Sequence, residues 1–245
     1  MLKDLSISIC VPAFNEEIAL RGAVEDLQKT LFAHIRDIEI IIVDDGSTDS
    51  TPQLAEELAK EYSNIKVMHH KKNIGVGVCY RDAVAVASCD YITWFPADHE
   101  NPAEQFIPSL PYLKKDSIVT FHHRGRDNRF LLRRLVSRIY TKFINIYFNL
   151  DLKYYNDLTI MPTSLVRSLT PVSGTSVIWA EILIRVIKHG YKLIELSAPL
   201  KGRQGSRSKT FTCLSIIKIM KDIFYILLKR DIRDAQSYKT QIITR

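Results

Sequence analysis

The stretch Glu39-Ile-Ile-Ile-Val43, followed at once by Asp44-Asp45-Gly46-Ser47, decides the fold of this chain. A continuous apolar run of this length is typical of a strand that is buried on both faces. The Asp-Asp-Gly-Ser segment that ends it has the chemistry of a tight turn. A strand covered on both faces needs helices above and below it, so this stretch predicts an α/β fold.

Three further strand-like runs lie on either side of this one. Residues 5–11 alternate in character and are rich in β-branched side chains, residues 65–69 read as a short strand, and residues 91–95 end in an aromatic pair before Pro96. These features are typical of strands.

Helical segments alternate with these strands. Asn15-Glu16-Glu17 supplies a polar cap and an acidic first turn, which predicts a helix running to about Phe32. Thr51 is a candidate cap for a second helix with Pro52 in its first position, and a third helix is expected to end near Ala87. Four strand–helix alternations predict a mostly parallel sheet with helices on both faces.

Polar clusters follow three of the expected strands, at residues 12–16, at Asp44-Asp45 and at residues 98–100. Ligands of parallel α/β sheets bind beyond the carboxyl ends of the strands. We therefore expect Glu16, Asp44 and Asp98 to face one crevice.

The second half of the chain has a different character. Residues 124–142 hold seven Arg and Lys side chains against one acid, and the ranges 129–149 and 215–230 have apolar residues at helical spacing with basic residues between them. We predict amphipathic helices there, a further helix at 176–188, and strands at 151–161 and 191–199. The last fifteen residues are polar, and we expect them to be loosely held.

Composition narrows the class of protein. The 245 residues carry a formal net charge of +7 with 46% hydrophobic residues, so a real core and an anionic partner are expected. The four cysteines are scattered without a Cys-x-x-Cys spacing, which indicates free thiols in a reducing compartment. The sequence shows neither a secretory signal nor an apolar run of the roughly 20 residues that span a bilayer, so we expect a soluble or peripheral protein.

Two carboxylate clusters are candidate ligand sites. Asp44 can accept hydrogen bonds from ribose hydroxyls or a base, or it can serve the turn alone. Asp98 and Glu100 stand at i and i+2 in an extended segment, so both side chains can bind one hard cation such as Mg²⁺ or Mn²⁺ beside a diphosphate. The alternative is a solvated acidic loop. The adjacent His69 and His70 should point to opposite faces of a strand and should not share an ion.

Basic segments suggest further contacts. Residues 203–209 are basic and rich in hydroxyls, which suits a phosphate clamp or a solvated linker. The amphipathic helices can rest in a membrane interface or pack on the sheet with a wet basic face. Nucleic acid is disfavoured, because the aromatic side chains fall on the apolar helix face and no nucleic-acid-binding motif occurs.

The chain resembles the family 2 glycosyltransferases, and within them the polyprenol- or dolichol-phosphate mannosyltransferase type. The resemblance covers roughly residues 5–210 and includes these segments: Val11-Pro-Ala-Phe-Asn-Glu16, Ile42-Val-Asp-Asp-Gly-Ser-Thr-Asp49, Asn73-Ile-Gly-Val-Gly77, residues 91–102, Asn156-Asp-Leu-Thr159 and residues 203–209.

This resemblance implies a GT-A-type, Rossmann-like fold over residues 1–210, followed by an amphipathic helix and polar tail at 211–245. Within that fold, the residues that it places at the nucleotide-sugar are Pro12, Phe14, Glu16, Ile42, Asp44, Ala97, Asp98, Arg124, Arg203 and Lys209. Asp98 and Glu100 would form the metal site there. The family's metal motif begins with an Asp where this chain has Pro96, so one ligand is missing and Glu100 is the candidate replacement.

The expected reaction is an inverting transfer of a single sugar from GDP-mannose or a UDP-hexose. The expected acceptor is polyprenyl phosphate at the cytoplasmic face of a membrane. Its phosphate is already anionic, so the reaction needs no strong general base. A glycan or lipopolysaccharide hydroxyl is the alternative acceptor and would need a general base, for which Asp157 and Glu181 are candidates. Arg203 and Lys209 would stabilise the leaving diphosphate. A third alternative is a catalytically inactive binding or scaffold relative.

Overall fold

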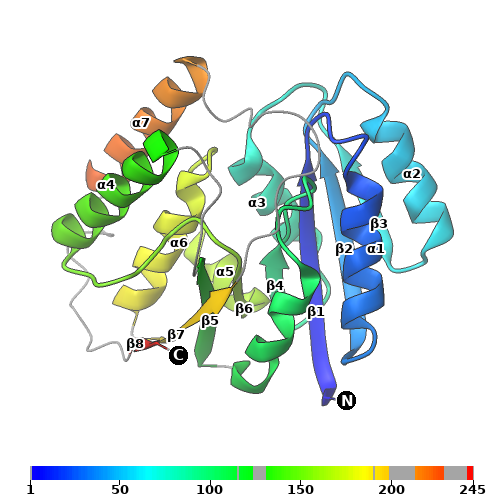
Figure 1. Ribbon diagram of the computed structural model, residues 1–245, viewed down its shortest axis with the longest axis horizontal. Coiled ribbons are helices and arrows are strands. Elements are labelled where there is room, and N and C mark those ends of the chain that lie inside the picture. The colour runs from blue at the N-terminus through cyan, green and yellow to red at the C-terminus, as the bar shows by residue number, and fades with distance from the viewer. Residues whose placement is uncertain are drawn as a thin grey trace.

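The computed structural model describes residues 2–114, 116–123, 131–189, 191–198, 213–228 and 242–244. Within these residues, one sheet of eight strands runs in the order β3-β2-β1-β4-β6-β5-β7-β8 (Figure 1). The strands are β1 (Leu2–Ala13), β2 (Ile35–Asp44), β3 (Ile65–His69), β4 (Tyr91–Trp94), β5 (Ser117–His123), β6 (Thr159–Pro162), β7 (Lys192–Ala198) and β8 (Ile242–Thr244).

The sheet is mostly parallel, as the sequence predicts. β1 pairs in parallel with both β2 and β4, and β2 pairs in parallel with β3. β6 is the exception, because it runs antiparallel to β4 and to β5. In the parallel half, Ala13 is level with Asp44, and Asp44 is level with His69. The carboxyl ends of these strands therefore lie at one edge of the sheet.

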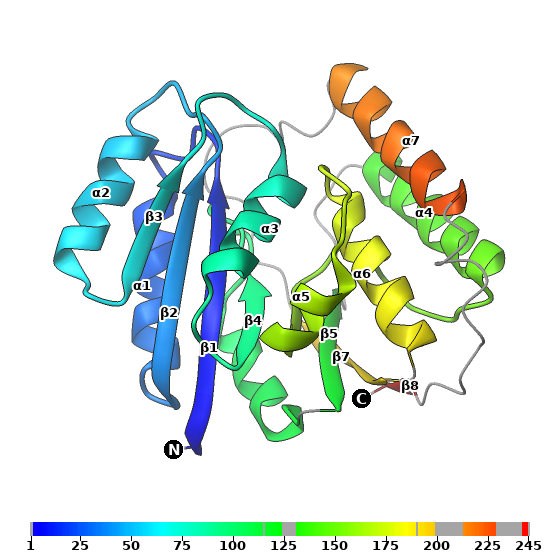
Figure 2. The ribbon, with the colours of Figure 1, turned by 180° about the vertical axis from the view of Figure 1, so that it is seen from behind.

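Helices cover both faces of the sheet (Figures 1 and 2). Their bounds are α1 (Leu20–Leu31), α2 (Thr51–Glu61), α3 (Val76–Val86), the 3₁₀ helix η1 (Ala103–Tyr112), α4 (Leu131–Phe148), α5 (Thr163–Leu169), α6 (Val177–Lys188) and α7 (Cys213–Leu228). Among the helices of the described residues, none is both long enough and apolar enough to cross a bilayer.

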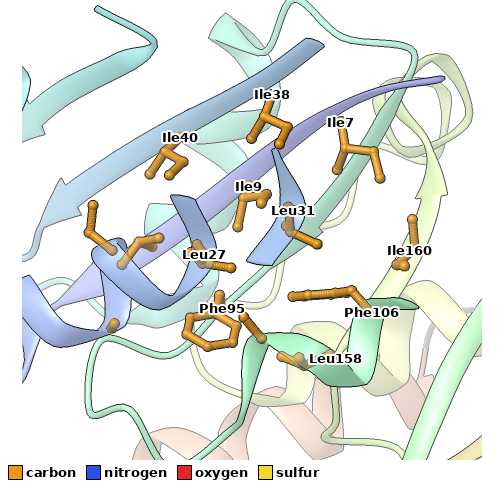
Figure 3. Packing of buried hydrophobic residues seen from close by; sticks show 14 of the residues in the cluster. Ile7, Ile9, Leu27, Leu31, Ile38, Ile40, Phe95, Phe106, Leu158 and Ile160 are labelled. Atoms are coloured by element: carbon orange, nitrogen blue, oxygen red, sulfur yellow. The ribbon is translucent and has the colours of Figure 1, made fainter. Parts of the chain in front are cut away.

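Each face of the sheet has its own hydrophobic core. On one face α1, α2 and η1 pack against strand side chains such as Ile9 and Ile40, and η1 contributes Phe106 to this core (Figure 3). On the other face α3, α5 and α6 pack against side chains such as Ile41, and the inner residues of α4 and α7 join the same cluster. The alternation along the Ile-rich run of β2 explains this arrangement, because successive side chains point to opposite faces.

The structure corrects three local predictions. α1 begins at Leu20 rather than at Asn15, because Asn15 has a φ of 53°, which a right-handed helix does not accept. Thr51 is the first residue of α2, with Ser50 in the cap position, so Thr51 is not the cap. Residues 151–158 have no regular structure, so the strand predicted at 151–161 is limited to β6, which begins at Thr159.

The remaining elements agree with prediction in part. The helices expected at 176–188 and 215–230 appear as α6 and α7, and the strand expected at 191–199 is β7. β5 and α5 were not predicted, and β8 lies in a tail expected to be loosely held. The domain boundary predicted at 210/211 falls outside the described residues and stays a prediction.

Candidate functional site

The loops that follow β1 and β2 are bound to each other at the carboxyl edge of the sheet. The Asn15 N–H donates to Ser47 Oγ at 2.9 Å, and Asn15 Oδ1 accepts from the Thr48 N–H at 2.7 Å. The Glu16 N–H donates to Thr51 Oγ1 at 2.8 Å. These bonds explain why the chain leaves β1 as a loop before α1 begins: the polar residues that resemble a helix cap are used across the two loops.

Asp44 and Asp45, at the end of β2, bind different partners. Asp44 is buried; its Oδ1 accepts from the Ser47 N–H at 3.0 Å, and its Oδ2 lies 3.1 Å from His69 Nδ1. Asp45 accepts from the N–H groups of the chain at residues 74 and 75, at 2.9 Å each. Both carboxylates therefore serve turns, and the contact of Asp44 with ribose expected from the resemblance stays a prediction.

The adjacent histidines contact separate pairs of carboxylates. His69 lies between Asp44 and Glu56, whereas His70 lies between Asp45 and Asp82. The hydrogen bond with Glu56 is the largest of the interactions that raise the pKa of His69, and Asp44 adds to it. The prediction that the two side chains do not converge on one point agrees with this geometry.

Asp98 and Glu100 line the same cavity, while His99 between them turns away. Asp98 Oδ1 accepts from the Glu100 N–H at 3.2 Å. His99 has a φ of 55°, and its Nε2 lies 3.0 Å from Asp26 Oδ2 of α1. The turn at His99 thus directs two carboxylates, separated by one residue, toward the same space, and carboxylate oxygens are the donors that Mg²⁺ and Mn²⁺ prefer.

The cavity has a volume of about 770 Å³ and is mainly apolar. It lies between the end of β4, the 154–158 segment, the start of α6, and the helices α4 and α7. Trp94 and Trp179 stack in its wall with ring centroids 4.5 Å apart and planes 10° from parallel. Its polar members include Asp98, Glu100 and Asp157. The cavity therefore places carboxylates at one side and a broad hydrophobic wall at the other.

The two candidate bases occupy different environments. Asp157 lines the cavity, is nearly fully buried, and accepts from the Leu158 N–H at 2.8 Å. Glu181 is fully buried and does not line the cavity. Its carboxylate accepts from the Ser173 N–H and hydroxyl, at 2.9 and 2.7 Å, and from Arg185 at 2.9 Å. These are the contacts of a structural carboxylate that holds the start of α6 in place, so Asp157 is the better placed of the two.

Several other predicted site residues lie elsewhere. Ile42 and Ala97 are buried, and their contact with a nucleotide-sugar stays a prediction. Pro12, Phe14 and Glu16 are partly exposed at the end of β1. Glu16 and Asp44 do not line the cavity that holds Asp98, although all three follow parallel strands that end at the same edge. Three further predicted residues lie outside the described part of the chain: Arg124, Arg203 and Lys209.

Sequence reasoning missed most of the cavity wall. Trp179 on α6 and Tyr140 on α4 both line it, and burial raises the pKa of the Tyr140 hydroxyl. On α7, Met220 and Phe224 also line it. The helical spacing of apolar residues predicts that these helices exist, but not that they meet above the end of β4.

Comparison with known proteins gives the family. The sequence profile described as "Glycosyl transferase family 2" matches residues 8–168, well over half of the chain. The chain belongs to glycosyl transferase family 2. The region matched includes both interlocked loops, Asp98, Glu100 and Asp157.

Individual relatives agree with this membership. CsbB of Bacillus subtilis is 27% identical over 181 residues, which cover 70% of this chain and 53% of CsbB. The glycosyltransferase GlyG of Streptococcus pneumoniae is 32% identical over 116 residues, which cover 46% of this chain and 38% of GlyG. The chain thus spans about half or less of the length of these relatives.

The fold has a counterpart among solved structures. Glucosyl-3-phosphoglycerate synthase of Mycobacterium tuberculosis superposes with a TM-score of 0.69 over 90% of this chain and 79% of its own, at 19% sequence identity. The GT-A-type α/β fold expected from the sequence is confirmed.

Proposed function

We propose that this chain transfers a single sugar, with inversion, from a nucleotide-sugar to a lipid-linked phosphate of the polyprenyl phosphate type. The proposal follows the family's chemistry, in which a nucleoside diphosphate leaves the anomeric carbon. The similar glucosyl-3-phosphoglycerate synthase has been crystallised with Mn²⁺, UDP-glucose and phosphoglyceric acid, a phosphate-bearing acceptor. For this chain, a UDP-hexose or GDP-mannose is the proposed donor.

The carboxylates at the end of β4 fit a divalent metal. Asp98 and Glu100 reach the same cavity, and Pro96, which lines it too, offers no side-chain ligand. A Mg²⁺ or Mn²⁺ ion held by Asp98 and Glu100 would neutralise charge on the leaving diphosphate. Without a cation, two carboxylates near a diphosphate would repel it, by about 4 kcal/mol for each charge pair at 4 Å and an effective dielectric near 20.

The single observation that carries the choice of acceptor is the apolar character of the cavity and of the helices that form its rim. α4 and α7 lie side by side, and Tyr147 of α4 donates to the Leu227 carbonyl of α7 at 2.9 Å (Figures 1 and 2). Large apolar side chains stand exposed on both helices, among them Ile139 (60% exposed) and Phe224 (63%). A hydrophobic chain that enters the cavity between α4 and α7 would bury apolar surface both against the exposed side chains of these helices and against the cavity wall.

The same two helices also carry exposed basic side chains. Arg138 and Lys142 on α4 and Lys218 and Lys221 on α7 are exposed. Each basic residue near an anionic leaflet contributes about 1 kcal/mol to membrane binding. We therefore propose that α4 and α7 rest on an anionic membrane surface, with the cytoplasmic face as the expected location, and that the acceptor enters from there.

The role of Asp157 distinguishes the two acceptor classes. A lipid phosphate attacks as an anion and needs no strong base, so Asp157 would then orient groups in the cavity. A sugar hydroxyl must lose a proton as it attacks, and Asp157 is the carboxylate placed to accept it. The position of Asp157 in the cavity keeps the glycan or lipopolysaccharide hydroxyl as the second candidate acceptor.

A transfer assay tests the proposal directly. The chain is incubated with labelled UDP-glucose, UDP-galactose or GDP-mannose, with Mg²⁺ or Mn²⁺, and with polyprenyl phosphate in vesicles or a soluble glycan. Product in the lipid fraction, lost with Asp98→Asn, supports the proposal. Product only on the glycan would favour the second candidate. Failure to bind or hydrolyse any donor with either metal would show a catalytically inactive relative, as the missing acid at Pro96 allows.

A further inference from the structure

Three side chains from different elements converge behind the Asp44 turn. Asp45 follows β2, His70 follows β3, and Cys79 lies in α3. His70 Nδ1 lies 2.9 Å from Asp45 Oδ1 and 3.9 Å from Cys79 Sγ, and one ligand atom of each residue lies within 4.8 Å of the other two. Asp45 and Cys79 are buried, and His70 is mostly so.

The hydrogen bonds around His70 show how its ring is used. Nε2 lies 3.0 Å from Asp82 Oδ2. A carboxylate can only accept, so a neutral His70 bound to Asp82 carries its proton on Nε2 and presents the lone pair of Nδ1 to Asp45. Two lone pairs 2.9 Å apart repel each other unless a positive charge lies between them. A metal ion bound to Nδ1 and to Asp45 would remove this repulsion and leave Asp82 as the acceptor of the Nε2 proton.

Cys79 supplies the third possible donor atom. Its thiol lies 3.4 Å from the Gly75 carbonyl and 3.9 Å from His70 Nδ1, and its sulfur lies within 4.8 Å of both Nδ1 and an Asp45 carboxylate oxygen. Burial, with the charge of Asp45, raises the pKa of this thiol well above its ordinary value. A bound cation reverses that effect, because a coordinating thiol is deprotonated.

We propose that Asp45, His70 and Cys79 form a structural Zn²⁺ site. Sulfur, imidazole and carboxylate together are a donor set of zinc, whereas the all-oxygen pair of Asp98 and Glu100 suits Mg²⁺ or Mn²⁺. Asp82 completes the arrangement as the carboxylate that holds the other nitrogen of a metal-binding histidine.

The position of the ion suits a structural role. It would tie the ends of β2 and β3 to the start of α3, directly behind the turn that presents Asp44. Asp45 already accepts from the N–H groups of Ile74 and Gly75, so the ion would add a third constraint to the same turn. The site is separate from the reaction cavity, since none of its three ligands lines that cavity.

Zinc content tests this proposal without donor or acceptor, so its outcome is independent of the proposed transferase activity. The chain is purified without a histidine tag, loaded with Zn²⁺, and dialysed before elemental analysis. We expect about one zinc per chain in the wild type, held by three protein ligands with water in the fourth position. Cys79→Ser should lose it, whereas Cys89→Ser, which changes a cysteine outside the cluster, should keep it.

Two further measurements guard against a variant that fails to fold. Competition with a chromophoric chelator gives the zinc affinity of the wild type itself, and Asp82→Asn should weaken it about 10–100-fold. Cobalt in place of zinc should give a sulfur-to-metal charge-transfer band in the wild type. A wild type that stays free of zinc would overturn the proposal. So would a folded Cys79→Ser variant that binds as much zinc as the wild type.

Discussion

The exposed phenyl ring of Phe224 gives the sharpest test of the proposed membrane contact. An aromatic side chain has about 150–250 Å² of surface, and 63% of Phe224 is exposed, so roughly 120 Å² is free to enter a lipid interface. At about 25 cal/mol per Å², complete burial would contribute about 3 kcal/mol to membrane binding. Phe224→Ser should therefore weaken partitioning on the order of 100-fold, since every 1.4 kcal/mol is tenfold.

Sedimentation with vesicles that contain anionic lipid measures this change. Phe32→Ser is a matched control, because Phe32 is 45% exposed at the end of α1, on the opposite side of the molecule from α7 (Figure 1). The wild type and Phe32→Ser should bind alike, and both should bind more weakly as salt is added, because Lys218 and Lys221 act through charge. Equal binding by Phe224→Ser and Phe32→Ser would refute the assignment of α7 to the membrane.

Further predictions concern the metal pair and two structural side chains. Asp98→Asn should lower kcat about 10²–10³-fold, as loss of one electrostatic stabiliser does. Glu100→Gln should weaken the dependence of activity on added metal. An unchanged metal titration would contradict the role of Glu100 as a metal ligand. Burial raises the pKa of Glu39, but hydrogen bonds from Lys66 and two serines outweigh it and hold this pKa below its usual value. Glu39→Gln should thus cost about 2 kcal/mol of unfolding free energy at neutral pH, and the difference should shrink as pH falls below about 4, which urea unfolding measures. The pKa of His69 is raised, so its contribution to stability is complete below about pH 6.5 and is lost as pH rises through the higher folded value; His69→Gln should remove this slope from thermal melts taken across that range.

Much of the parallel half of the sheet could be predicted from the sequence. The Ile-rich run of β2 shows burial on both faces, and the strands at 65–69 and 91–95 are bounded by turn residues that act locally. The start of α1 could not be predicted in the same way. Asn15 resembles a helix cap, but its amide and side chain bind residues that lie more than 30 positions further along the chain.

The shared position of Asp98 and Glu100 was predictable from their spacing, since both line one cavity. The extended segment predicted for them is wrong, because His99 has a φ of 55° and the chain turns there. Metal binding by the pair stays a prediction. The opposite wall depends on how α4 and α7 pack over α6, and periodicity gives only the face of a helix, not its partner. Glu181 shows the same limit, because a carboxylate in an apolar helix suggests catalysis until its hydrogen bonds to Ser173 are seen.

The hydrogen bonds between the loops after β1 and β2 also determine which main-chain groups at this edge of the sheet are open to a ligand. The backbone N–H groups of Asn15, Glu16, Thr48 and Ser50 are already taken by side chains of the facing loop. We expect a base at this edge, where the resemblance places it, to gain no hydrogen bond from these four groups. Exchange of a side chain such as Phe14 can then change the preferred ligand while the hydrogen bonds between the loops are kept.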